Sequence, residues 1–168
     1  IEQIDMVKSI KRDFLKEGGL MIVDPVMGDN GKLYTHFDDR FVREMRGLCA
    51  EADVIVPNLT EASFLTGCDY SSIQESDYPA LLEKLGQFCP LPSVTGCDIE
   101  CGGRTMCAVF YTRADGSAAH FATEKIEGAF HGAGDVYASA LVGCLARGVD
   151  MDEAVRIAAQ FTTESIRQ

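Results

Sequence analysis

The sequence has no apolar run that approaches the ~20 residues needed for a membrane-spanning helix. Its first fifteen residues mix charged and apolar side chains, so we expect no signal peptide. Basic residues are also few, with 15 Lys and Arg against 26 Asp and Glu, for a net charge of -11. These features argue against a membrane protein and against nucleic acid as a partner, because nucleic-acid binding requires clustered Lys and Arg. A nucleotide is still allowed, since metal ions and backbone amides can hold phosphates in an acidic protein.

Three common ligand-binding motifs are missing as well. The seven cysteines include no C-x-x-C pair, and Cys97 and Cys101 lack the second pair of ligands that a zinc site needs. Gly31-Lys32-Leu33 lacks the Ser or Thr of a Walker A loop, and Tyr137 stands where a dinucleotide fingerprint needs its third glycine. We therefore expect reduced thiols and a cytoplasmic location, with nucleotide binding, if any, through another motif.

What is present is an ordinary globular composition. The 168 residues are 46% hydrophobic and 24% charged, enough for one domain with a real core. The chain starts at Ile1 rather than at methionine and stops at Gln168 within a helical pattern, so we expect a piece of a longer polypeptide that lacks its N-terminal part.

Helical patterns alternate with short apolar runs over the first ~95 residues, which predicts a mainly parallel sheet covered on both faces by helices. We expect a loop at residues 28–38 and a turn after Thr95. A hairpin and two helices then complete a single partial domain over residues 1–168. The predicted helices lie near 4–14, 41–48, 60–65, 81–88, 134–147 and 150–161, and the predicted strands near 20–23, 54–56, 93–95, 105–112 and 118–123.

Polar residues follow two of the predicted strands. Asp24 and Asp29 come after the first strand, and Asn58 and Glu61 come after the second. Ligands of open α/β sheets bind beyond the carboxyl ends of the strands, and carboxylates there suit Mg²⁺. Each pair also fits a plainer structural role, an acidic turn for the first and a helix cap for the second.

The segment Gly132-Ala133-Gly134-Asp135 opens an apolar helix. Glycines allow close backbone approach, and the free amides and dipole of a helix N-terminus suit an anion. The same dipole would keep Asp135 ionised and able to accept a proton. By itself, this pattern equally fits a tight turn with an acidic first helical turn.

Together and in this order, these motifs resemble the pyridoxal kinase branch of the ribokinase-like superfamily. The similar segments are Val23-Asp24-Pro25-Val26-Met27-Gly28-Asp29 with Gly31-Lys32-Leu33-Tyr34, Pro57-Asn58-Leu59-Thr60-Glu61-Ala62, Val94-Thr95-Gly96 and Gly132-Ala133-Gly134-Asp135. The resemblance covers the whole chain. It implies a three-layer α/β/α fold, incomplete on its N-terminal side, and transfer of the ATP γ-phosphate to the 5′-hydroxymethyl group of pyridoxal, pyridoxine or pyridoxamine.

The resemblance also implies roles for individual residues. Asp135 is the expected catalytic base, and the amides of Gly132, Ala133 and Gly134 are the expected anion hole. The expected ATP-binding residues are Asp24, Asn58, Thr95, Gly96 and Tyr34, and Mg²⁺ is expected at Asp24, Asp29 and Glu61, directly or through water. The segment around 29–35 is expected to fold over the nucleotide. A monovalent cation such as K⁺ and a homodimer are further implications, whereas most of the vitamin site is expected in the missing part, so no substrate-binding residue is assigned.

Two alternatives stay open. Hydroxymethylpyrimidine (phosphate) kinases of thiamine synthesis share the Asp24-Pro25-Val26-Met27 segment, although that branch often has Cys in place of Asp135. A non-catalytic nucleotide-binding fragment or relic is the alternative of another class. The presence of every proposed catalytic side chain argues against it.

Overall fold

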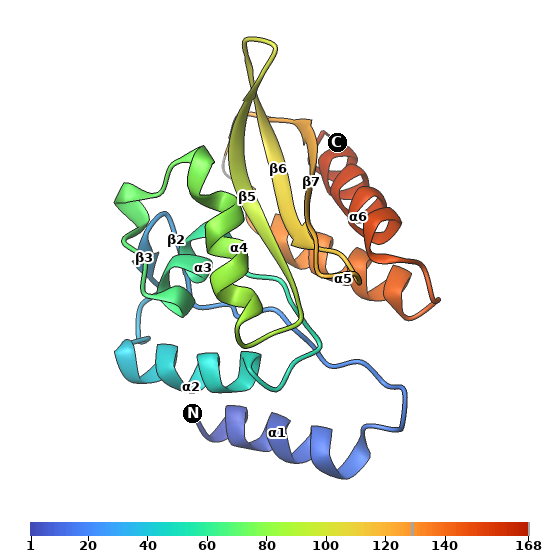
Figure 1. Cartoon of the computed structure of the whole chain (residues 1–168). Coiled ribbons are helices and arrows are strands. Elements are labelled where there is room, and N and C mark those ends of the chain that lie inside the picture. Colours follow the sequence, from blue (N-terminus) through green and yellow to red (C-terminus); the bar gives the residue numbers. More distant parts are fainter. Residues whose placement is uncertain (129, 168) are drawn as a thin grey trace.

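The computed structural model describes residues 1–128 and 130–167. A five-stranded sheet, in the order β1-β4-β5-β6-β7, has α3 and α4 on one side and α5 and α6 on the other (Figure 1). The elements in chain order are α1 (Glu2–Phe14), β1 (Ile22–Val23), β2 (Gly28–Asp29), β3 (Lys32–Leu33), α2 (Asp39–Cys49), β4 (Val54–Ile55), α3 (Leu59–Thr66), the 3₁₀ turns η1 (Tyr70–Ser72) and η2 (Glu75–Asp77), α4 (Tyr78–Gly86), β5 (Leu91–Cys101), β6 (Arg104–Thr112), β7 (Ala118–Glu124), α5 (Ala133–Leu145) and α6 (Met151–Ile166).

The sheet is parallel where helices alternate with strands and antiparallel across the predicted hairpin. β4 pairs in parallel with both β1 and β5, whereas β6 pairs antiparallel with β5 and β7. Parallel strands end at a common edge, and an isolated parallel bridge joins Asn58 to Thr95 there. The predicted α/β fold is confirmed. Its parallel part brings the segments that begin at Asp24, Asn58 and Thr95 to one edge.

β5 corrects one prediction. The segment after Thr95 continues as a strand to Cys101 instead of forming a turn, with an irregularity in register between Val94 and Cys97. Cys97 and Ile99 are buried while the residues between and after them are exposed, which is the period of a half-buried strand. Gly96, with φ of +71°, lies within the irregularity and was misread as the start of a turn.

Each face of the sheet has its own core. Val54 and Ile55 are both fully buried and, as neighbours on a strand, belong to opposite cores. Ile55 packs with residues of α2, α3 and α4, and Val54 with residues of α5 and α6. Burial of both faces explains why β1 and β4 appear in the sequence as continuous apolar runs.

Two predicted apolar helix faces are only partly covered. In α1, Ile4 is buried, but Ile10 and Phe14 are 51% and 76% exposed. In α6, Ala154 and Ala158 are buried, whereas Phe161 is 55% exposed. The 3.6-residue period predicted the helices correctly, because it depends on local spacing. It did not predict which apolar side chains of each helix are covered by other elements.

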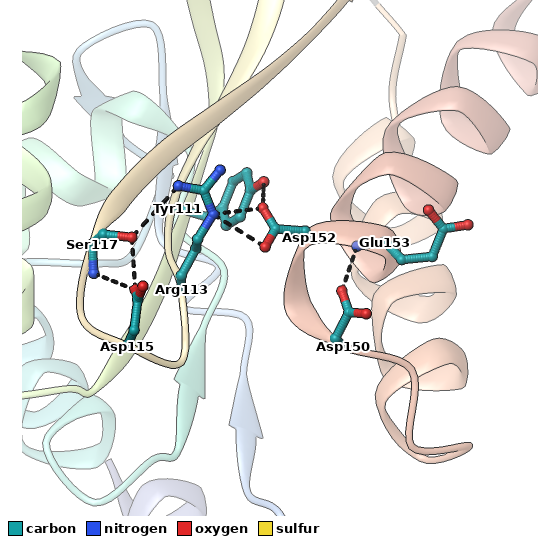
Figure 2. Close-up of polar contacts among 7 residues, drawn as sticks. All are labelled: Tyr111, Arg113, Asp115, Ser117, Asp150, Asp152 and Glu153. Atoms are coloured by element: carbon teal, nitrogen blue, oxygen red, sulfur yellow. Dashed lines mark hydrogen bonds and ion pairs between the residues drawn. The ribbon is translucent and has the colours of Figure 1, made fainter.

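A polar cluster ties the hairpin turn between β6 and β7 to the start of α6 (Figure 2). The Tyr111 hydroxyl donates to Asp152 at 2.5 Å, and the Arg113 guanidinium donates to the same carboxylate at 2.8 Å. These hydrogen bonds hold the pKa of Asp152 below its usual value, with the Tyr111 bond the larger cause. Tyr111 pairs with Ser93, two residues before Thr95 on β5, so this cluster lies on the side of the Asn58–Thr95 bridge toward the start of β5.

Two further features bear on the predictions. All seven cysteines are free thiols. Of the helices within the described residues, none combines the length and apolar character needed to cross a bilayer.

Candidate active site

Asp24 and Asp135 lie close enough at the carboxyl edge of the parallel strands for their charges to interact, although they are 111 positions apart in the chain numbering. Asp24 follows β1, is partly buried, and has a pKa raised to about 6, first by burial and then by the charge of Asp135. Asp135 lies in the first turn of α5 and is exposed. The start of α5 therefore lies near the end of β1.

The start of α3 is held by a complete capping box. The Asn58 side chain accepts from the Glu61 amide at 2.9 Å, and Glu61 Oε2 accepts from the Asn58 amide at 2.9 Å. The other carboxylate oxygen of Glu61 accepts from the Met27 amide at 3.0 Å, and the Asn58 amide group donates to the Gly28 carbonyl at 2.9 Å. The plainer cap interpretation is thus correct, and the cap also binds the segment after β1.

Glu61 is only 3% exposed, and burial raises its pKa to about 7, opposed by its backbone hydrogen bonds. Because each carboxylate oxygen already accepts a backbone N–H, Glu61 has limited capacity to bind a metal directly. Its metal role, expected directly or through water, stays a prediction, and these bonds favour contacts through water or the holding of other ligands in place.

The segment predicted as a loop contains a small hairpin. β2 and β3 pair antiparallel through a two-residue turn, Asn30-Gly31, with φ values of +51° and +74°. Asn-Gly is the commonest sequence for such a turn, so this signal was present in the sequence and was overlooked. Asp29 precedes the turn, and Tyr34, whose amide donates to the Met27 carbonyl at 2.9 Å, follows it.

Thr60 is a buried contact that the sequence analysis missed. The Gly31 amide donates to Thr60 Oγ1 at 2.9 Å, and Thr60 is 2% exposed. Asp29 was predicted as a metal ligand, and its carboxylate accepts from the backbone and side-chain amides of Asn30 at 2.8 and 2.9 Å.

The start of α5 is open by comparison. Gly132 is the N-cap with φ of +87°, and no side chain of the described residues caps the helix with a hydrogen bond. A Cβ built at Gly132 would lie 3.9 Å from Asp135 Oδ2, so the Asp135 carboxylate lies close to the N-cap. The Ala133 amide donates to the Phe130 carbonyl at 3.3 Å, whereas the amide of Gly134 has no hydrogen-bond acceptor within the described part of the chain. Of the three predicted anion-hole amides, that of Ala133 is already hydrogen-bonded, and those of Gly132 and Gly134 have no acceptor within residues 1–128 and 130–167.

The pKa of Tyr34 reflects the acidic side chains at this edge. Its pKa is raised, first by burial and then by the charges of Asp29, Glu61, Asp135 and Asp24. The charges that raise the pKa values of Asp24, Tyr34 and Glu61 are all those of acidic side chains, so negative charge is concentrated at this edge.

This donor set suits a hard cation. Carboxylate and amide oxygens are the ligands of Mg²⁺, which usually keeps several waters and uses one or two carboxylates together with phosphate oxygens. Within residues 1–128 and 130–167, no three His, Cys, Asp or Glu side chains form a group able to hold a metal ion by themselves. The residues therefore fit a cation that is completed by phosphate and water and not one enclosed by protein.

Comparisons with known proteins agree with this geometry. The profile of the phosphomethylpyrimidine kinase family matches residues 1–168. The pyridoxine kinase of Bacillus subtilis is 31% identical over 170 residues, which cover 96% of this chain and 58% of that enzyme. A Bacteroides thetaiotaomicron protein provisionally named a phosphomethylpyrimidine kinase, in a crystal form with pyridoxal, is 32% identical with a TM-score of 0.88 and covers 98% of this chain.

A further solved structure is pyridoxal kinase from Leishmania donovani in complex with ADP and pyridoxamine. It is 27% identical with a TM-score of 0.78, and it covers 99% of this chain. The match spans 58% of the length of each of these three relatives. The resemblance to pyridoxal kinases of the ribokinase-like superfamily is thus confirmed, in sequence and in fold.

Proposed function

The chain belongs to the phosphomethylpyrimidine kinase family, and from that premise we propose that the whole protein transfers the γ-phosphoryl group of ATP to the 5′-hydroxymethyl group of a B6 vitamer. The observation that carries the proposal is the meeting of Asp24 and Asp135 at the carboxyl edge of β1, beside an open helix N-terminus. The pyridoxine and pyridoxal kinases among the relatives, one of them in complex with ADP, support the choice of substrate and nucleotide.

In this reaction the hydroxyl oxygen of the vitamer bonds to the γ-phosphorus, the bond to the β-phosphate bridging oxygen breaks, and ADP leaves. Asp135 accepts the hydroxyl proton. The amides at Gly132, Ala133 and Gly134 face the charge that develops on the transferring group, where a helix N-terminus is favourable. Because phosphoryl transfer depends mostly on positioning and charge neutralisation, Asp135 acts chiefly by orienting the hydroxyl and by accepting the proton late.

The carboxyl edge would hold the nucleotide phosphates. Thr95 and Gly96 on β5 and Asn58 before α3 lie at this edge, and Asp24 and Tyr34 lie beside it.

Asp24, which is partly buried, and Asp29, which is exposed, are the carboxylates that would hold Mg²⁺, with the buried Glu61 acting through water. When bound, Mg²⁺ would neutralise phosphate charge at this edge. A monovalent cation, a homodimer and a cytoplasmic location, which the free thiols favour, belong to the same proposal.

Hydroxymethylpyrimidine phosphorylation is the second candidate, because the matched family profile carries that name. Asp135, at the position where that branch often has Cys, favours the B6 vitamer.

The test is a turnover assay of the full-length protein with ATP and Mg²⁺, comparing pyridoxal, pyridoxine and hydroxymethylpyrimidine. We expect the highest kcat/KM with a B6 vitamer. Turnover of hydroxymethylpyrimidine alone would reverse the choice of substrate, and ATP binding with no turnover of either class would favour the non-catalytic alternative.

A further inference from the structure

The turn of the β2–β3 hairpin is attached to α3 by a hydrogen bond that the proposed chemistry does not use. The Gly31 amide donates to Thr60 Oγ1 at 2.9 Å. Thr60 is the second residue of α3 and is 2% exposed, so its hydroxyl is not available to solvent or substrate. A buried hydroxyl aimed at a turn in another segment, 29 positions away, is a tertiary contact and not part of the helix cap.

A second observation concerns the same turn. A Cβ built at Gly31 would lie 2.7 Å from Cδ1 of Tyr70, so the ring of Tyr70 in η1 already lies against the Gly31 backbone. Gly31 also has φ of +74°, which favours glycine. The turn is therefore held from one side by a hydroxyl and from another by an aromatic ring.

The other end of the hairpin is held by the cap of α3, through Met27 and Gly28. Asp29 lies between these attachments and belongs, with Tyr34 at the base of the hairpin, to the acidic edge that includes Asp24 and Asp135. If the turn were free to move, Asp29, which directly precedes it, would move with it.

We propose that Thr60 is a positioning residue, whose hydroxyl holds the Asn30-Gly31 turn so that Asp29, directly before the turn, remains at the phosphate end of the site. The attachment itself follows from the contacts above, and its effect on catalysis rests on the proposed function. Thr60 does not touch the reacting atoms in this scheme, and it acts through the hairpin.

The first experiment measures the attachment without reference to activity. Amide hydrogen exchange at Gly31 is followed by NMR in the full-length protein for the wild type, Thr60→Val and Thr60→Ser. Thr60→Val removes the acceptor with little change of shape, and we expect exchange on the order of fivefold faster, as for the loss of one hydrogen bond. Thr60→Ser keeps the hydroxyl and should exchange as the wild type does.

Thr66→Val is the matched control. Thr66 lies on the same helix, and its hydroxyl donates to the Ala62 carbonyl within α3 and not to the hairpin. We expect its Gly31 exchange to be unchanged. If Thr60→Val does not fold, Thr60→Ala also removes the hydroxyl, and its Gly31 exchange is compared with that of the wild type instead. Unchanged exchange at Gly31 after loss of the hydroxyl would overturn the proposal.

The second experiment measures the consequence. In the same variants we expect Thr60→Val to raise the KM for ATP roughly fivefold with kcat changed less than twofold, because it weakens ground-state and transition-state binding alike. Thr60→Ser should restore the KM. Faster Gly31 exchange with an unchanged KM would refute the positioning role while leaving the attachment. A full-length protein without B6 kinase activity would refute the proposed function, and the exchange result would still decide whether Thr60 holds the turn.

Discussion

The helices α3 and α5 both begin with an acidic residue in the first turn, and they differ in whether that carboxylate is already hydrogen-bonded. Each has an acidic residue three positions after its N-cap, Glu61 after Asn58 and Asp135 after Gly132. Glu61 is 3% exposed and accepts hydrogen bonds on both carboxylate oxygens. Asp135 is exposed, and its carboxylate has no hydrogen-bond donor within the described residues.

The N-cap residue accounts for the difference. Asn58 has a side chain that accepts from the Glu61 amide, and Glu61 returns to the Asn58 amide. Gly132 has no side chain and a φ of +87°, so the start of α5 is not closed by a reciprocal cap. A carboxylate whose oxygens are already bonded serves structure, whereas one without such bonds is able to accept a proton. Both lie at the same edge, and Asp135 is the one that we propose as the base.

The largest expected effect is that of Asp135→Asn. The variant keeps the shape of the side chain and loses the proton acceptor, so kcat should fall roughly 10²–10⁴-fold while ATP still binds. The measurement is steady-state turnover together with ATP binding by calorimetry.

Asp39→Asn, an exposed acid in the first turn of α2, is the control for the loss of a charge at a helix start, and it should leave turnover unchanged. Turnover of Asp135→Asn within a factor of two of the wild type would make α3 and α5 equivalent and remove the assignment of the base.

The next effect is on stability. Asn58→Ala removes the N-cap of α3 and the bond to the Gly28 carbonyl, and should lower the free energy of unfolding by about 2 kcal/mol. Urea denaturation measures the change.

Asp38→Ala removes the N-cap of α2, whose side chain accepts from the Phe41 amide, and no hairpin contact is involved. We expect a smaller loss for Asp38→Ala. Equal losses in the two variants would mean that the cap of α3 contributes nothing through the hairpin.

The smallest effect concerns Asp24 and depends on pH. Its pKa rises from 3.8 to about 6 in the folded protein, so the folded state retains the proton more strongly than the unfolded state across this window. Stability from this group therefore falls as pH rises from 3.8 to about 6, and the penalty is fully present above that pH.

Asp24→Asn should remove the penalty. At pH 8 the variant should be more stable than the wild type by about 1 kcal/mol, since solvent screens a partly exposed carboxylate, with no gain at pH 4 and with reduced turnover. Thermal unfolding at both pH values measures the difference. Asp5→Asn, an exposed acid of α1, should show no such gain at pH 8, and a gain that persists at pH 4 would have another cause.

Several features were predictable because they depend on local spacing. The helices and most strands were placed by their apolar period, and the capping box of α3 by Asn58 and Glu61. The hairpin at Asn30-Gly31 was also readable, since Asn-Gly marks this turn, but the surrounding polarity directed attention to a loop. The full length of β5 was hidden by Gly96, which interrupts its period without ending the strand.

By itself, the sequence determined the α/β class, the family and the order of the four motifs, because periodicity and short motifs are local properties of the chain. Only the tertiary structure decided which carboxylates remain free of hydrogen bonds from the described residues and exposed to a ligand. The environment of Glu61, Asp24 and Asp135 depends on β1, α3 and α5 meeting at one sheet edge, where burial and nearby charge set each pKa. The attachment of Gly31 to Thr60 is of the same kind, since a bond across 29 positions has no signature in local spacing.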